Sequence, residues 1–154
     1  MKSLSFVLVL APLVAGGAFG LGWHYLDREK HPAEETFEAF YWKLQKRELS
    51  AASALVDPGS EADLALSEER AQSAAGTAQA PSARGFALDL DHESDGELAG
   101  RPVIHLHGQA TVRVDPAGYA SAFGVAVPHE VEARMVEADG SWRVATYRDI
   151  VLTP

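Results

Sequence analysis

The spacing of apolar residues changes once along the chain. Between residues 32 and 75 apolar side chains recur every three or four positions, whereas from Phe86 onward they alternate with polar ones. The first spacing places side chains on one face of a helix, and the second places them on one face of a strand. Helices that precede a run of strands joined by turns predict an α+β fold.

The first helix is predicted to begin near Pro32, because proline favours the first helical turn and two glutamates follow where the helix dipole favours acids. One apolar stripe then occupies positions i, i+3, i+4 and i+7: Phe37, Phe40, Tyr41 and Leu44. We interpret this stripe as core-facing rather than as a cofactor-stacking surface. A short helical piece ends at residues 57–59, and an alanine-rich helix with shallow burial is predicted from Ser60 to about Ala75.

The second half of the chain predicts an antiparallel sheet of about four strands. The strands are expected near residues 86–91, 101–114, 131–135 and 142–152. Turns are expected at Ser94-Asp95-Gly96, Asp115-Pro116-Ala117-Gly118 and Asp139-Gly140. The last of these dipeptides is the strongest hairpin signal in the chain. The prediction is therefore helices packed on a curved antiparallel meander.

The N-terminus holds an uncharged run from Leu4 to Trp23. At ~1.5 Å per residue it matches the ~30 Å hydrocarbon core of a bilayer. We predict that residues 1–27 are a retained membrane anchor and that residues 28–154 form an extracytoplasmic α+β domain, with a single pass through a bacterial-type inner (cytoplasmic) membrane. The alternative is a cleaved signal peptide, with Lys2 before the apolar core, which leaves the domain secreted or periplasmic. Both interpretations export the domain.

Composition and charge exclude several classes of function. The net charge of -9 argues against nucleic acid as a partner, since binding phosphates requires a clustered basic face. The chain has no cysteine, which removes disulfides, thiolate metal sites and cysteine nucleophiles. It also lacks a phosphate-binding loop and a dinucleotide fingerprint, so no cofactor is predicted.

The segment "VIHLHGQ" places His105 and His107 two residues apart in an apolar context. If the neighbouring Ile104 and Leu106 face the helices, both imidazoles face away from them. Pairing with the strand that begins near Phe86 would add Asp89 and Asp91 to the same side. Three interpretations follow: a polar outer face or interface, which we favour; a zinc or copper site completed by a carboxylate; or a reversed strand that turns both histidines toward the core.

Other candidate residues carry weaker signals. Trp142, Tyr147 and Tyr41 are candidates for a pocket or an interface, although core packing explains them better. No G-x-S-x-G motif supports a nucleophilic triad, so no catalytic residue is assigned. Five charged residues are expected to form cross-strand pairs on an exposed sheet face: Glu130, Glu132, Arg134, Arg143 and Arg148.

Two segments resemble the nuclear transport factor 2-like superfamily, in which a curved antiparallel sheet wraps a long first helix. "AEETFEAFYWKLQKRELSAASALVDP" is similar to the opening helices of that family, and "VEARMVEADGSWRVATY" is similar to its closing hairpin. The resemblance covers roughly residues 32–152, and a cystatin-like roll is the structural alternative. The superfamily includes ketosteroid isomerases, polyketide cyclases, many non-catalytic domains and membrane-tethered subunits that assemble with partners.

These observations predict a membrane-anchored, extracytoplasmic accessory or assembly domain that acts by protein–protein interaction without catalysis. A protein partner or a homo-oligomer is expected. The alternative is a small isomerase-like or cyclase-like enzyme, or an apolar-ligand-binding domain, that uses a cone-shaped cavity. The enzyme alternative requires at least one ionisable side chain that points inward.

Overall fold

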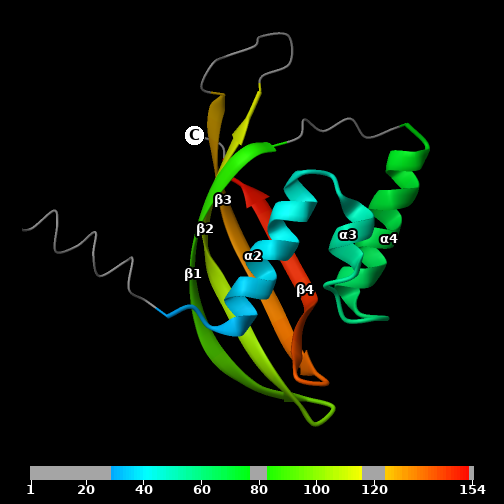
Figure 1. The fold of residues 1–154 in the computed structure, drawn as a ribbon, viewed down its shortest axis with the longest axis vertical. Coiled ribbons are helices and arrows are strands. Elements are labelled where there is room, and N and C mark those ends of the chain that lie inside the picture. The colour runs from blue at the N-terminus through cyan, green and yellow to red at the C-terminus, as the bar shows by residue number, and fades with distance from the viewer. Residues whose placement is uncertain (1–28, 77–82, 116–123, 153–154) are drawn as a thin grey trace, which may run out of the picture. The chain divides into compact units, whose positions relative to one another are not determined.

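The helices of the protein precede its strands and pack on one face of a four-stranded sheet (Figure 1). A computed structural model describes residues 29–76, 83–115 and 124–152. Its helices are α2 (Pro32–Gln45), α3 (Leu49–Ser53) and α4 (Glu61–Ala74), and its strands are β1 (Ala83–Leu98), β2 (Arg101–Val114), β3 (Val125–Ala138) and β4 (Ser141–Val151). The predicted α+β class, with helices on an antiparallel sheet, is confirmed. All of these elements belong to one compact unit, His31–Pro154.

The predicted membrane anchor, residues 1–27, lies outside the described residues. Among the residues that the structure does describe, no helix is both long and apolar enough to cross a membrane.

Helix α2 begins and buries its stripe as the sequence predicts. The imidazole Nδ1 of His31 accepts a hydrogen bond from the backbone N–H of Ala33 at 3.1 Å, which satisfies one of the free donors of the first turn. The four residues of the predicted stripe are all buried: Phe37, Phe40, Tyr41 and Leu44. Burial of each aromatic side chain contributes roughly 1.5–3 kcal/mol to folding. The stripe is therefore a core surface.

Few side chains of helix α4 are buried. Only Ala62 and Leu66 are buried along its length, and Leu64 is 67% exposed. The Ser60 hydroxyl accepts a hydrogen bond from the backbone N–H of Asp63 at 3.3 Å, as expected for the residue that caps a helix start. The predicted shallow burial of this helix is confirmed.

The strands form a meander in the order β1-β2-β3-β4, and each neighbouring pair is antiparallel. The β3–β4 turn forms at Asp139 and Gly140, as predicted; both residues have positive φ, at 52° and 75°. The β1–β2 turn was predicted at residues 94–96, which is before its actual position. Chain reversal occurs at Ala99-Gly100, while residues 94–97 form an irregularity inside β1 with Gly96 at φ 76°.

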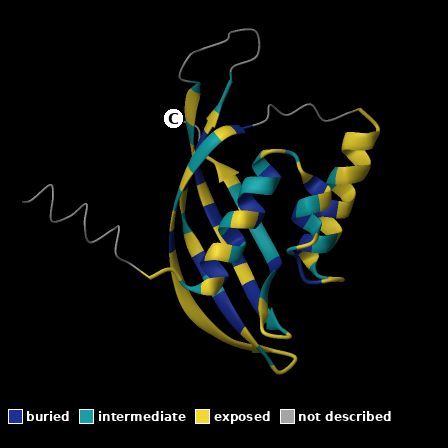
Figure 2. Cartoon of the chain, in the orientation of Figure 1, coloured by how far each residue is buried: buried dark blue, intermediate teal, exposed yellow. Residues whose placement is uncertain are grey.

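Opposite sides of the sheet have different chemistry, and we call them the inner face and the outer face. The inner face contacts the helices: α2 packs against β1, β3 and β4, and α4 packs against β4. In Figure 2 buried and exposed residues alternate along the strands, as expected when successive side chains point to opposite faces of a sheet. Buried inner-face residues include Leu106, Ala110, Val112, Val131, Ala133 and Met135.

Gly108 allows β1 and β2 to approach closely. A Cβ atom added at Gly108 would lie 2.0 Å from the backbone oxygen of Asp89, a distance that no real side chain tolerates. Glycine inside a strand commonly marks such a close backbone approach. The sheet curves along β1 and β2 in Figure 1. Gly108 belongs to β2, where it directly follows His107.

The segment after α3 protects part of the edge of β4. Val56 forms a parallel bridge with Val144, where the Val144 N–H donates to the Leu55 carbonyl at 2.9 Å and the Asp57 N–H donates to the Val144 carbonyl at 2.9 Å. The Asp57 carboxylate then accepts two bonds from the Arg101 guanidinium, at 2.7 and 2.9 Å. Helix α3, β4 and the start of β2 are thereby connected.

Candidate functional site

Both histidines of "VIHLHGQ" lie on the outer face. In the β1–β2 register Glu93 is opposite His105 and Asp91 is opposite His107. Leu106, between the two histidines, is fully buried under the helices, and His107 is exposed. Strand alternation therefore places the imidazoles on the side away from the core. The reversed-strand interpretation is wrong.

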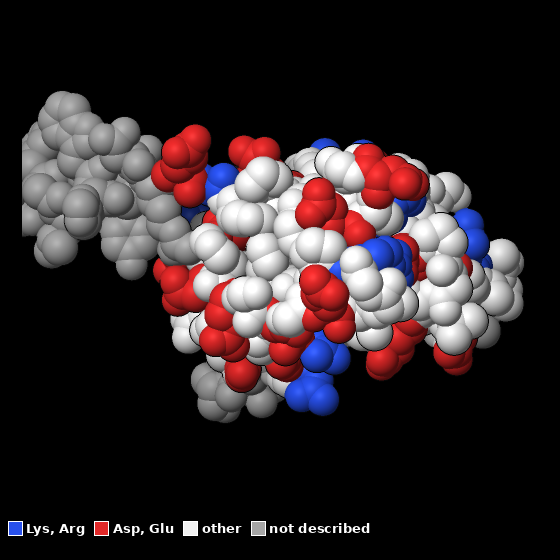
Figure 3. Space-filling view, turned by 90° about the horizontal axis from the view of Figure 1, so that it is seen from below, with Lys and Arg blue, Asp and Glu red and all other residues white. Residues whose placement is uncertain are grey.

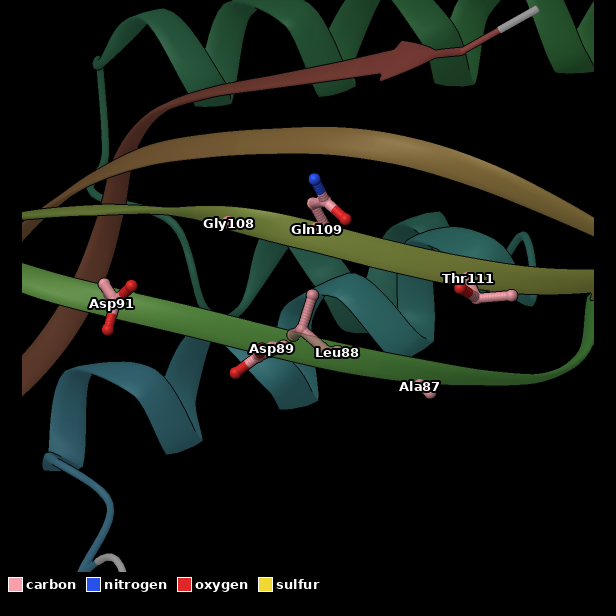
Figure 4. A pocket seen from close by; sticks show the side chains of 7 residues that line it. All are labelled: Ala87, Leu88, Asp89, Asp91, Gly108, Gln109 and Thr111. Atoms are coloured by element: carbon pink, nitrogen blue, oxygen red, sulfur yellow. The ribbon is translucent and has the colours of Figure 1, made fainter. Parts of the chain in front are cut away.

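The outer face carries polar side chains from all four strands. They include Asp89, Asp91 and Glu93 on β1, His105, His107 and Gln109 on β2, Glu130, Glu132 and Arg134 on β3, and Thr146 and Arg148 on β4. Besides a small hollow lined by Val103, Arg134 and Thr146, two shallow depressions lie on this face. Glu93, both histidines and Glu132 line one of them. Asp89 and Asp91 of β1, with Gln109 and Thr111 of β2, line the other, and their side chains are shown in Figure 4.

His105 lies between two carboxylates that come from the strands on either side of it. Its Nδ1 is 3.2 Å from Glu93 Oε1, and its Nε2 is 2.9 Å from Glu132 Oε1. Desolvation of the ring lowers the pKa of His105, but hydrogen bonds to both carboxylates and their negative charges outweigh that effect, so the pKa is raised above 6.5. The ring is held in place by both contacts.

Glu93, His105 and His107 form a compact group of potential metal ligands. One donor atom from each residue lies within 4.8 Å of the other two. The two imidazole ring centres are 5.6 Å apart. We call these three residues with Glu132 the outer histidine cluster.

The predicted carboxylates of this site were Asp89 and Asp91, and neither belongs to the ligand group. Asp89 is opposite Gln109 in the register, two positions along β2 from His107. The sequence analysis did not name Glu93, although a signal existed, since residues 89, 91 and 93 alternate onto the same face. What the pattern lacked was the pairing register, which selects Glu93 as the neighbour of His105.

A second polar cluster, the inner carboxylate cluster, lies on the inner face and contains Tyr41, Gln45, His129 and Asp149. Its centre is the Asp149 carboxylate, which accepts from the Tyr41 hydroxyl at 3.3 and 3.4 Å and from Gln45 Nε2 at 3.0 Å. His129 Nδ1 is 2.6 Å from Asp149 Oδ1. Because burial, then the Asp149 charge and the hydrogen bond to it, raise the pKa of Tyr41 strongly, this hydroxyl keeps its proton.

His129 and Asp149 were not identified from the sequence, although a signal existed. His129 is in phase with the buried residues Val131, Ala133 and Met135, and Asp149 is in phase with Tyr147. A polar residue in an apolar phase of a strand requires a buried partner. His129 and Asp149 are therefore two ionisable residues that point inward, as the enzyme alternative requires.

Trp142 and Tyr147 pack against the core, as the sequence analysis predicted when it favoured core packing over a pocket or an interface. Tyr147 contacts Phe40 edge-on, with ring centres 5.1 Å apart. Burial, followed by the charges of Glu69 and Asp149, raises the pKa of Tyr147 to about 12. Trp142 is half-buried, and its ring lies 5.4 Å from that of His31.

The N-terminal end of α2 holds a third polar contact. Glu34, predicted only as a first-turn acid, is 5% exposed and contacts the Nδ1 of His92 on β1. The His92 ring is 5.0 Å from the His31 ring. This contact joins the start of α2 to β1.

Charge pairs occur on the outer face, but their partners differ in part from those predicted. Arg134 donates from Nε to Asp95 Oδ2 at 2.7 Å, and Glu132 contacts His105. Glu132 and Arg148 are opposite each other in the register. In Figure 3, which views the molecule from below, acidic side chains are spread over the visible face with basic ones between them, in keeping with the net charge of -9.

Comparisons with known proteins add no identification: no protein-family model, no curated protein and no solved structure matches the chain. The protein is therefore classified by its fold. In the described residues it is an α+β domain with three helices on a four-stranded antiparallel sheet.

Proposed function

We propose that the protein is an accessory or assembly domain that binds a protein partner through the outer face of its sheet. The observation that carries this proposal is the contrast between the two faces. Inner aromatic residues Phe37, Phe40 and Tyr41 are at most 1% exposed, so they fill the space between α2 and the sheet. The outer face presents ionisable side chains to solvent, where a partner can reach them.

The excess of acids on this face suggests the chemistry of the partner. Its acidic residues include Asp89, Asp91, Glu93, Glu130 and Glu132. A partner surface with lysine and arginine side chains would complement them, and such complementarity mainly speeds association and selects the partner. Residues 1–27 are proposed to hold the domain on the extracytoplasmic side of a membrane, and a nuclear transport factor 2-like or cystatin-like roll is proposed as its fold family.

The test is affinity purification of the full chain from its native membranes in gentle detergent. Glu130→Arg reverses one exposed charge on the outer face and is expected to reduce recovery of the partner at least several-fold. Glu61→Arg is the matched control, because it makes the same charge change at an exposed position on α4. Recovery of the chain alone, or equal loss in both variants, would contradict the proposal.

The anchor is tested by the N-terminal sequence of the mature protein. A chain that begins at its first residues supports retention. A chain that begins near residue 20 shows signal cleavage, which replaces the anchored domain with a secreted or periplasmic one.

A second candidate function is binding of, or chemistry on, a small apolar molecule. The observation that favours it is the inner carboxylate cluster, because ionisable groups point inward as an enzyme of this kind requires. Native mass spectrometry of protein extracted from its own membranes tests it. A bound small molecule that is lost in Asp149→Asn supports this function, and detection of the bare polypeptide alone contradicts it.

A further inference from the structure

We propose that the outer histidine cluster is a zinc site in which Glu93, His105 and His107 are the ligands and Glu132 orients His105. The zinc site shares Glu93 and Glu132 with the acidic face proposed to bind a partner, but zinc binding requires no partner and is tested without one. It differs from the site predicted from the sequence in its carboxylate, since Glu93 replaces Asp89 and Asp91.

The donor set suits zinc. Two imidazole nitrogens and one carboxylate oxygen are a common three-ligand set for this ion, which leaves a fourth position for water. The absence of cysteine removes the softer alternatives based on thiolates. Copper(II) binds similar ligands more tightly in general, so availability decides between the two ions.

The distances require only side-chain movement. Ligand atoms at about 2.0–2.1 Å from a tetrahedral zinc lie roughly 3.4 Å apart. The three donor atoms here lie within 4.8 Å of one another, so a shift of roughly 1.5 Å or less closes the site. The Glu93 side chain is 65% exposed, and His107 is also exposed, so both have room to rotate.

The orientation of His105 is the feature that separates this site from a chance grouping of polar residues. Its Nδ1 faces Glu93, whereas its Nε2 lies 2.9 Å from Glu132 on the other neighbouring strand. A histidine that binds zinc through one nitrogen usually donates its other N–H to a carboxylate, which fixes the ring and raises its basicity. Glu132 is placed to accept that bond.

The backbone also preorganises the ligands. Both histidines lie in β2, a central strand of the sheet that pairs with β1 on one side and β3 on the other. The H-x-H spacing places both imidazoles on one face, and the register places Glu93 beside the first of them. Ligands on rigid elements keep their separation before the metal arrives.

The experiment is isothermal titration calorimetry of Zn²⁺ into the full chain, purified without a histidine tag and kept in detergent. We expect one Zn²⁺ per chain. His107→Gln and Glu93→Gln each remove a ligand and are expected to weaken binding at least tenfold, and Glu132→Gln is expected to weaken it 10- to 100-fold. Asp89→Asn, the control, removes an acid from the same face outside the ligand group and should leave the affinity unchanged.

Three results would overturn the site. They are no saturable binding, unchanged affinity in both ligand variants, or an equal loss in Asp89→Asn, which would indicate adsorption to an acidic surface. Circular dichroism confirms that each variant is folded. If a variant is unfolded, zinc X-ray absorption of the wild-type protein replaces it: two imidazole ligands are expected, and a spectrum without imidazole scattering contradicts the proposal.

Discussion

At the scale of single residues, the polar side chains on the two faces of the sheet are held by different contacts. Asp149 accepts hydrogen bonds from two side chains of α2 and contacts a histidine of β3, so the carboxylate joins the helix to the sheet. His105 instead lies near solvent and bridges two carboxylates across three strands. The side chains of the first group are mostly buried, and those of the second are accessible to a ligand from solvent.

Replacement of Asp149 by alanine is expected to lower the free energy of unfolding by about 3 kcal/mol, because it leaves the buried Tyr41 hydroxyl and His129 ring without their acceptor. Urea denaturation measures this change. Asp89→Ala on the exposed outer face is the control and should change the free energy by no more than about 0.5 kcal/mol. A loss below about 1 kcal/mol for Asp149→Ala would contradict the role assigned to the inner carboxylate cluster.

The raised pKa of His105 predicts the direction of a pH effect on stability. The folded state binds the proton more tightly than the unfolded state, whose pKa is near 6.5. The stabilisation is therefore complete below pH 6.5 and is lost as the pH rises through the folded-state value. Urea denaturation of metal-free protein should show this decline in the wild type and a smaller one in His105→Gln. Equal pH dependence in both proteins would disprove the assignment.

At the scale of elements, the close approach of β1 and β2 depends on one glycine. Gly108 lies beside the backbone of Asp89. The register of β1 and β2 places Glu93 opposite His105, so the outer histidine cluster depends on how these two strands pair. Residues 55–57 form backbone hydrogen bonds with Val144 of β4. These bonds hold the segment after α3 at the edge of the sheet opposite β1. Strand register and edge contacts therefore determine which side chains meet.

Gly108→Ala is expected to destabilise the protein by roughly 3 kcal/mol, because the new methyl group overlaps a backbone oxygen that moves only if the strands separate. Thermal unfolding followed by circular dichroism measures the effect. Gly85→Ala is the matched control within β1, since nothing lies within 4 Å of a Cβ atom there. Similar melting temperatures for the two variants would show that β1 and β2 do not approach closely at Gly108.

At the scale of the whole molecule, folding and localisation are predicted to reside in separate parts of the chain. Every described helix and strand lies within His31–Pro154, and residues 1–27 carry the long uncharged run. Removal of the run takes away the only segment whose sequence predicts membrane insertion.

A chain without residues 1–27 is expected to leave the membrane fraction and to unfold at nearly the same temperature as the full chain. Carbonate washing of membranes followed by immunoblotting checks the first outcome, and circular dichroism checks the second. Retention of the truncated chain in washed membranes would contradict an anchor in residues 1–27. A large drop in melting temperature would instead show that these residues contribute to the fold.

Much of the architecture could be predicted from the sequence because it depends on local periodicity. The stripe from Phe37 to Leu44, the alternation through Ile104 and Leu106, and the turn at Asp139-Gly140 each carry their own signal. The β1–β2 turn was predicted too early because Gly96 adopts positive φ inside an irregular strand as readily as in a turn. Local signals of this kind mark a bend without stating its type.

The sequence by itself determined that helices precede a meander and that His105 and His107 share one face, because both follow from periods of about 3.6 and two residues. Only the tertiary structure decided that Glu93 lies beside His105 and that Asp149 meets Tyr41 and His129. Those contacts depend on strand register and on how α2 packs across the sheet. Register and packing arise from the sum of many distant contacts, which no short stretch of sequence records.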